Sequence, residues 1–376
     1  MGPAAVLLFV VAALLFANRH PALAPLFRWL PVPLWCYAIP MTAVTAGWLP
    51  PEQPVYRLIT THSLPVALAL LLLGVDLPSV TRTGWRVVTA ALLGAAGIIL
   101  GAPLAVWLLR AHLPPEAWKG AGTLAGTWTG GTMNLLAIRA ILEPPEAVFA
   151  PLIAVDALIA YGWMAMLVAA SAHQAAADRW LRADSRLQTV AAPSPEASGT
   201  RWTVVLVSGV IALLIACGAQ CIAPSLPTSR WVSSASGWSV LLVTTAALIL
   251  SLIPPVRRSG AHGSVLGYPV LYLVLAATGA QARLDALWST PVWVVLGLVI
   301  VATHGIVLLM AGRWLRLPLG LLATASQANI GGLVSAPMVG AVYHQSLAPV
   351  GLLLALAGNA VGTYLGLLAA TLCRRL

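Results

Sequence analysis

The chain has 376 residues, of which 60% are hydrophobic and only 8% are charged. A soluble domain normally carries about a quarter charged residues, so this composition excludes an ordinary soluble protein. The net charge of +10 would suggest nucleic-acid binding in a soluble chain, but the arginines lie at the ends of apolar segments, as at 257–258 and 374–375, which is typical of membrane anchoring. We therefore expect a multi-pass helical protein of the cell membrane that contacts the lipid bilayer and binds no nucleic acid.

Twelve apolar segments follow one another along the chain, and the long ones reach the roughly 20 residues that cross a bilayer. They span 3–17, 31–49, 63–77, 86–109, 118–140, 148–173, 202–222, 236–254, 267–280, 291–312, 318–342 and 347–372. The first segment has no basic residue before it and is followed by Arg19. It therefore resembles a first membrane helix more than a signal peptide.

A polar stretch divides the chain nearly in half. The sequence "DRWLRADSRLQTVAAPSPEASGTR" (178–201) is rich in Ser, Pro, Ala and charge, as an extramembrane linker would be. We predict an N-terminal transmembrane repeat over 1–173, a polar linker on the cytoplasmic side over 174–201, and a C-terminal transmembrane repeat over 202–376.

The two halves share an order of elements. Each has two ordinary apolar segments, a short one that ends in polar residues, a long one, a segment with a glycine pair, and a last helix with one polar residue shortly before a tyrosine. Gly131 precedes Asp156 by nearly the same interval as Gly332 precedes Asn359. The pattern predicts an all-α fold of two six-element repeats. The residues alone leave both arrangements open: parallel repeats if every element crosses, or inverted repeats if one element per half is re-entrant.

The glycine-pair segments read "GTWTGGTMN" (126–134) and "SQANIGGLV" (326–334). Glycine costs about 1 kcal/mol against alanine within a helix, and irregular backbone at membrane depth occurs only beside protein or a wet cavity. We predict an interrupted or re-entrant helix at each pair. Half-helix N-termini facing such a gap favour an anion, and C-terminal ends favour a cation. The predicted solute-binding residues are Thr127, Thr129, Gly130, Gly131, Thr132, Asn134, Ser326, Gln327, Asn329, Gly331, Gly332 and Ser335. The alternative is that these small and polar residues serve only close helix packing.

Asp156 is the one acid deep inside an apolar segment. A carboxylate at mid-bilayer costs at least about 3 kcal/mol, so it is usually neutral, paired or bound to a cation. We predict that Asp156 carries the coupling ion, either H⁺ or Na⁺, with its counterpart Asn359 able to coordinate but not to titrate. His304 and Arg139 are secondary candidates, for which a packing role and an interfacial anchor are the respective alternatives.

The sequence offers little for enzymatic chemistry. No zinc-protease, nucleophile-elbow or P-loop motif occurs, and the only lysine is Lys119. Cys217 and Cys221 lack the further ligands of a metal site. We expect no enzyme activity, no cofactor and no metal beyond Na⁺.

Several segments resemble a known family. The stretches "TGAQARLDALWSTPVWVVLGLVIVATHGIVLLMAGRWLRLPLGLLATASQANIGGLVSAPMVGA" (278–341) and "GLLLALAGNAVGTYLG" (351–366) resemble the C-terminal half of the uncharacterised DUF family 819. "GTWTGGTMNLLAI" (126–138) and the Asp156 helix ending "WMAML" match its glycine–glycine–asparagine and aspartate signatures, while Asn359 stands where an aromatic residue is expected. The family is grouped with a clan of cation–proton antiporters and anion transporters that share inverted repeats with interrupted helices. The resemblance therefore implies the inverted arrangement.

Together these features predict an ion-coupled secondary transporter of a small organic solute, with an anion as one option, working by symport or antiport through alternating access. A homodimer is a further option. The rival hypotheses are a passive membrane channel and a membrane protein whose glycine motifs only pack helices.

Overall fold

The computed structural model describes residues 2–23, 26–27, 32–76, 84–184, 187, 202–227, 232, 234–282 and 290–376, and within these ranges the chain forms helices and connections but no strand. Tertiary contacts divide it into two compact units. Unit 1 comprises Met1–Val75, Arg139–Ala157 and Thr200–Pro291, and unit 2 comprises Asp76–Ile138, Leu158–Gly199 and Val292–Leu376.

Each unit draws on both halves of the sequence. The first three apolar segments of each half lie in unit 1, and most of the last three lie in unit 2. The helices α8 (Thr132–Leu142) and α9 (Glu146–Ala170) contribute residues to both units. The division by contacts therefore does not follow the predicted boundary at the linker, because helices from the two halves of the sequence pack with each other, as α4 does with α14 and α7 with α18.

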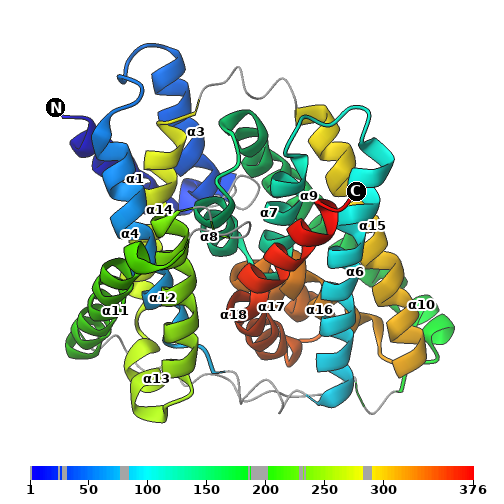
Figure 1. Cartoon of the computed structure of the whole chain (residues 1–376). Helices are drawn as coiled ribbons and strands as arrows, with labels where there is room; N and C mark the ends of the chain where they lie inside the picture. Colours follow the sequence, from blue (N-terminus) through cyan, green and yellow to red (C-terminus); the bar gives the residue numbers. More distant parts are fainter. Residues whose placement is uncertain are drawn as a thin grey trace. The chain divides into compact units, whose positions relative to one another are not determined.

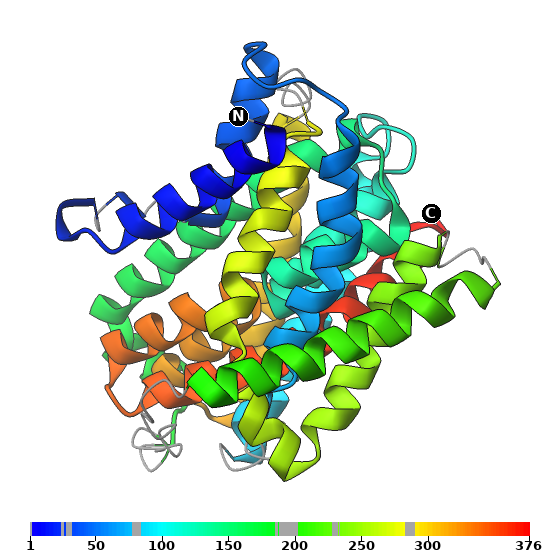
Figure 2. The ribbon, with the colours of Figure 1, turned by 90° about the vertical axis from the view of Figure 1, so that its left-hand side faces the viewer.

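Unit 1 is built around α4. Its helices are α1 (Pro3–Asn18), η1 (Pro21–Leu23), α3 (Val32–Thr45), α4 (Pro54–Leu72), α11 (Trp202–Ile222), η5 (Ala223–Ser225), α12 (Ala235–Ser251), α13 (Pro254–Gly260) and α14 (Ser264–Gly279). The helices α11, α12 and α14 all pack against α4, and Figure 2 shows α14 (yellow) running beside α4 (blue). Small residues allow this approach, since a Cβ on Gly74 would lie 2.6 Å from Gly260 O. Large side chains on the other face of α11, such as Leu206 and Leu214, are exposed, as lipid contact requires.

The predicted segment 236–254 is not one straight helix. Ser234 begins α12 by accepting a hydrogen bond from Gly237 N at 3.1 Å, and α12 ends at Ser251. The chain then turns by 116° into α13, which starts at Pro254. Proline cannot donate the backbone hydrogen bond that would continue the helix, and the residue before it avoids the helical region. The Pro254–Pro255 pair therefore accounts for the bend.

Unit 2 contains the two glycine-pair segments. Its helices, besides parts of α8 and α9, are α6 (Trp85–Leu109), α7 (Ala117–Gly130), η3 (Ser171–His173), α10 (Gln174–Leu181), α15 (Thr290–Leu315, its first two residues in unit 1), α16 (Leu319–Ile330), α17 (Gly332–Tyr343) and α18 (Leu347–Cys373). The helix α18 packs against α7, α16, α17 and α6, and in Figure 1 α16, α17 and α18 (orange to red) lie together. The glycine-pair segments are thus surrounded by helices of their own unit.

Six helical stretches of the described residues are long and apolar enough to cross a membrane, or seven if the bent α12–α13 pair counts as one span. These stretches are Pro54–Leu72, Trp85–Leu109, Glu146–Leu181, Trp202–Ser225, Pro291–Leu315 and Leu347–Cys373. The other apolar helices, α1, α3, α8 and α14, have 10–17 residues. Most of the twelve predicted segments therefore appear as helices, but fewer than twelve meet the length and composition of a full crossing.

Part of the predicted polar linker is helical and packed. The helix α10 covers Gln174–Leu181, and Asp178 on it accepts a hydrogen bond from Leu319 N at 2.7 Å. Asp178 thereby caps the first turn of α16 from a distant part of the chain. Arg313 Nη1 donates to Trp180 O, and Arg86 pairs with Asp184 at 3.4 Å. The linker prediction holds at most for residues after 184, and 185–186 and 188–201 lie outside the described residues.

We predict that Asp178→Ala lowers the free energy of unfolding by about 1 kcal/mol, because the first amides of α16 lose their acceptor. Asp178→Asn keeps an acceptor oxygen and should retain most of this stability. Thermal unfolding of the two purified variants measures the difference. Equal midpoints for Asp178→Ala and wild type would show that the cap is energetically neutral.

Candidate functional site

Both glycine-pair segments break their helix. The helix α7 ends at Gly130, Gly131 has φ +80° and ψ 174°, and α8 starts at Thr132. We call this the first break. Residues with a Cβ rarely adopt such a φ, so the second glycine of the pair permits the turn. Gly131 N still donates to Thr127 O, and Asn134 N donates to Gly131 O at 2.9 Å.

The second break has the same design. The helix α16 ends at Ile330, and α17 starts at Gly332, which has φ +73°. Gly331 has φ −103°, which any residue can adopt. In both pairs, therefore, the second glycine supplies the left-handed backbone. The interruption predicted from the sequence is present at both places.

The two breaks lie against each other. A Cβ on Gly332 would be 3.8 Å from Gly131 Cα, and a Cβ on Gly131 would be 3.1 Å from Asn359 Oδ1. All three residues belong to unit 2. The structure thus brings together two predicted binding residues that are two hundred positions apart and the predicted ion ligand Asn359 on α18.

The first glycine of each pair has a different role, which is to leave space. A Cβ on Gly331 would overlap Gln327 Nε2 and Ser335 Oγ. A Cβ on Gly130 would overlap Asn134 Nδ2 and would lie 2.5 Å from Gly358 O. In both cases an overlapped side chain, Ser335 or Asn134, belongs to the residue four positions after the glycine. The two segments thus share the place of the glycine relative to a polar side chain.

Asn134 is fully used at the first break. It is completely buried, its Nδ2 donates to Gly130 O at 2.6 Å, and its Oδ1 accepts from Thr363 Oγ1 at 2.5 Å. A longer contact of 3.4 Å joins Nδ2 to Asn359 O. These bonds connect the end of α7, the start of α8 and α18. Asn134 therefore holds the first break in place and has no spare hydrogen-bonding group for a solute.

The other predicted residues of the first break differ in what they offer. Thr129 Oγ1 donates to Ala125 O at 2.9 Å, so its hydroxyl is engaged. Thr127 is buried, and its Oγ1 has no hydrogen-bond partner within the described part of the chain. Thr132 is half-buried at the start of α8. Thr127 is thus the residue of this segment with unused polar capacity.

The second break also contains one buried polar atom without a hydrogen-bond partner in the part of the chain that the structure describes. Gln327 Nε2 donates to Ser335 Oγ at 2.9 Å, whereas Gln327 Oε1 is buried without a partner among the described residues. Asn329 Nδ2 donates to Ala91 O at 3.0 Å, which fixes its amide to α6. One acceptor of the second break, Gln327 Oε1, is therefore unused.

His304 is a buried connection between helices. Its Nδ1 is 2.8 Å from Gly94 O and its Nε2 is 2.8 Å from Ser326 Oγ. A carbonyl oxygen can only accept, so Nδ1 carries the hydrogen, and Nε2 of the neutral ring accepts from Ser326. Ser326 Oγ in turn accepts from Trp163 Nε1 at 2.8 Å. The ring is fully satisfied and joins α6 and α15 to α16, which favours the packing role over a direct functional one.

Asp156 and Arg139 lie in unit 1, whereas the two breaks lie in unit 2. Asp156 is half-buried on α9. Arg139 donates to Glu146 Oε1 and, at 2.9 Å, to Thr278 Oγ1, and its guanidinium lies 4.5 Å from the centre of the Phe149 ring. Its charge is therefore already paired, which argues against the role of a free counter-charge for an anion. Glu146, in the first turn of α9, supplies the partner.

A glycine seam between α7 and α18 was missed in the sequence. Gly122, Gly126 and Gly130 face Gly358, Gly362 and Gly366, and a Cβ on Gly362 would lie 2.8 Å from Gly130 Cα. The contacts run in opposite directions along the two helices, so α7 and α18 are antiparallel. The spacing of four in "GTLAGTWTG" and "GNAVGTYLG" was the available signal, since small residues at this interval let membrane helices approach closely. Gly130 thus takes part in close helix packing, as the packing alternative expects.

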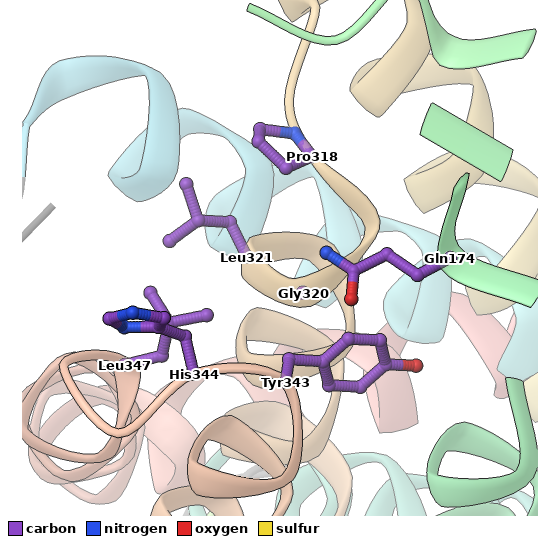
Figure 3. Close-up of a pocket in the computed structure, with 7 residues that line it drawn as sticks. All are labelled: Gln174, Pro318, Gly320, Leu321, Tyr343, His344 and Leu347. Carbon is purple, nitrogen blue, oxygen red and sulfur yellow. The ribbon is translucent and has the colours of Figure 1, made fainter. Parts of the chain in front are cut away.

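A cavity of about 130 Å³ lies elsewhere in unit 2, and Gln174, Pro318, Gly320, Leu321, Tyr343, His344 and Leu347 line it. Figure 3 shows the Gln174 amide and the Tyr343 ring on one side and His344 with Leu347 on the other. Tyr343 Oη donates to Leu167 O at 2.6 Å. The lining contains no residue of either break, so this cavity is separate from the candidate site. Within the described residues, no three His, Cys, Asp or Glu side chains gather to hold a metal ion.

The helices and the paired breaks define a multi-span helical membrane protein. The chain matches the family described as "Protein of unknown function (DUF819)" over residues 5–376, and it belongs to that family. One curated relative is "Uncharacterized membrane protein YjcL" of Bacillus subtilis (strain 168), which is 31% identical over 121 residues. The match covers 32% of this chain and 30% of the length of that relative.

Proposed function

We propose that this protein is an ion-coupled secondary transporter of a small organic solute that works by alternating access in the cell membrane. The observation that carries the proposal is the adjacency of the two broken helices at Gly131 and Gly332. Each break removes backbone hydrogen bonds in an apolar chain, which is unfavourable unless the freed groups serve a purpose. Two such breaks side by side concentrate donors and acceptors at one place.

The solute would bind where α8 and α17 begin. Their first amides have no partner within their own helix, and helix N-termini favour negative charge. The side chains near the breaks are neutral amides and hydroxyls, among them Asn359 and Gln327, which orient a polar group without fixing its charge. A small organic anion matches this arrangement, because the amides at the two N-termini would offset its charge.

Asp156 remains our candidate for the coupling ion. Among the described residues it is the one acid in the interior of a long apolar helix, since Glu146 stands in the first turn of α9, and an acid at such a place in a membrane helix is a candidate for function. Binding or release of H⁺ or Na⁺ there would bias the two states of the transporter by differential affinity. No enzymatic step is part of the proposal, and a homodimer is compatible with it.

The packing rival has support of its own, because the α7–α18 seam uses Gly122, Gly126 and Gly130 for close approach. It gives no reason for the left-handed backbone at Gly131 and Gly332, since close packing needs only the missing Cβ. A passive channel is the other rival. It would conduct at high rates without dependence on an ion gradient.

The test uses the full chain reconstituted in proteoliposomes with a panel of small carboxylates, amino acids and peptides. We expect at least one compound to be taken up in a way that requires an inward H⁺ or Na⁺ gradient. In Asp156→Asn we expect the rate of this uptake to fall about tenfold or more. Uptake unchanged in Asp156→Asn would remove Asp156 from coupling. Gradient-independent flux at channel rates would contradict the proposal itself.

A further inference from the structure

The second break contains a buried acceptor with no partner. Gln327 is 1% exposed, its Nε2 donates to Ser335 Oγ, and its Oε1 makes no hydrogen bond within the described chain. A buried polar atom left unpaired costs about 1–3 kcal/mol. In a protein that otherwise satisfies most of its buried side chains, such an atom points to a ligand that the amide oxygen would contact.

At the first break, by contrast, the buried amide side chain has both its nitrogen and its oxygen hydrogen-bonded. Asn134 lies four residues after Gly130, as Ser335 lies four residues after Gly331, and both ends of the Asn134 amide are used by Gly130 O and Thr363 Oγ1. The two breaks thus share backbone geometry but differ in their polar side chains. Among the described residues of the two breaks, only the second break has a buried amide oxygen without a hydrogen-bond partner.

The surroundings of Gln327 favour a cation. Its side chain lies in the last turn of α16, whose C-terminal end carries the negative end of the helix dipole. Gln327 O accepts from Gly331 N at 2.8 Å, while the carbonyls of the following residues have no intrahelical donor. Half-helix C-terminal ends and unwound carbonyls are the groups that coordinate alkali cations in transporters.

The ligand set is neutral. The helices α16, α17 and α18 contain no Asp, Glu, Lys or Arg over 319–330, 332–343 and 347–373, and α7 contains Lys119 but no acid. The one titratable ring near this turn, His304, is bonded on both nitrogens. The described residues of these helices therefore offer no carboxylate for a proton, whereas carbonyl and hydroxyl oxygens of this kind can coordinate a hard cation.

We propose that Gln327 Oε1, Ser335 Oγ and the terminal carbonyls of α16 form a binding site for an alkali cation, for which Na⁺ is the probe. This inference rests on the proposed transport function and names its coupling ion and a second place where the ion binds besides Asp156. Because the ligands are neutral, the bound cation keeps its charge. It would therefore raise the affinity of the neighbouring N-termini of α8 and α17 for an anionic solute, and the solute would raise the affinity for the cation by the same factor.

The test measures the thermal unfolding midpoint of the purified full chain in NaCl and in choline chloride at equal ionic strength. A ligand that binds only the folded state raises the midpoint in a saturable way. We expect a sodium-dependent rise for wild type. In Gln327→Met, which keeps the side-chain size but removes the oxygen, we expect the half-saturating sodium concentration to rise about tenfold or more. The variant also loses the Nε2 donor to Ser335 Oγ, so its own midpoint in choline is the baseline for its sodium-dependent rise. Gln220→Met on α11 is the control away from the site. It removes a half-buried amide that contacts His62, and its sodium dependence should match that of wild type.

No sodium-dependent rise in wild type, or an equal rise in Gln327→Met, would overturn the site. If Gln327→Met does not fold, Ser335→Ala carries the test, and unchanged sodium dependence in that variant overturns the site as well. Transport driven by a proton gradient in sodium-free vesicles would remove the cation site while leaving the proposed transporter intact. The two proposals are therefore separable.

Discussion

The Gly130→Ala variant is expected to lose roughly 1–3 kcal/mol of unfolding free energy, the usual cost of overpacking a filled core. The added Cβ would lie 2.5 Å from Gly358 O and 2.9 Å from Gly362 Cα. Both of these are backbone atoms of α18, so neither can rotate away as the end of a side chain would. The helices α7 and α18 would have to separate, and the first break would move with them. Chemical or thermal unfolding in detergent measures the loss.

Gly162→Ala is the matched control for this prediction. Gly162 lies within α9, and a Cβ there would meet nothing within 4 Å. Alanine is the better helix former by about 1 kcal/mol, so Gly162→Ala should be neutral or stabilising. If Gly130→Ala and Gly162→Ala unfold at the same midpoint, the close α7–α18 seam does not contribute as described.

The Asn134→Leu variant is expected to lose about 1–3 kcal/mol of unfolding free energy, although leucine has the same branching at Cγ as asparagine. The change removes the donor to Gly130 O and the acceptor for Thr363 Oγ1. Gly130 O and Thr363 Oγ1 would be left in a buried, apolar setting, since Asn134 is completely inaccessible and Thr363 is 1% exposed. The measurement is the free energy of unfolding of the purified variant.

A double-mutant cycle with Thr363→Val isolates the Asn134–Thr363 bond. The coupling energy should be about 1 kcal/mol, within the range measured for hydrogen bonds between membrane helices. Strict additivity of the two single variants would mean that the hydroxyl finds another partner when Asn134 is lost, and the network would then be weaker than its distances indicate.

The functional inference from the second break differs from the one made on the sequence. The sequence treated all polar residues of both glycine segments as equal solute ligands. The structure separates them. The polar groups of Asn134 and Asn329 are bonded to other helices, and the Thr129 hydroxyl is bonded to a carbonyl of its own helix, whereas Gln327 and Thr127 each retain an unpaired oxygen. Residue type and spacing cannot make this distinction, because it depends on which carbonyl or hydroxyl lies within reach in three dimensions.

Residue type and spacing also could not predict the glycine seam or which helices of the two halves pack together. The glycines of α7 and α18 are visible in the sequence, but which helix lies opposite which is decided by packing, and the two helices come from opposite halves of the chain. The same holds for α10, whose polar sequence predicts a solvated linker. It folds as a helix because Asp178 finds the amides at the start of α16.

The sequence by itself determined the membrane class, the positions of most helices and the two interruptions. These follow from local causes: apolar length sets where a helix lies in lipid, and a glycine pair gives the chain a φ that other residues avoid. Only the tertiary structure decided that the interruptions at Gly131 and Gly332 meet, and which polar atoms beside them stay unpaired. Both depend on contacts between residues far apart in the chain, and the energy of a buried polar group is set by its neighbours in space.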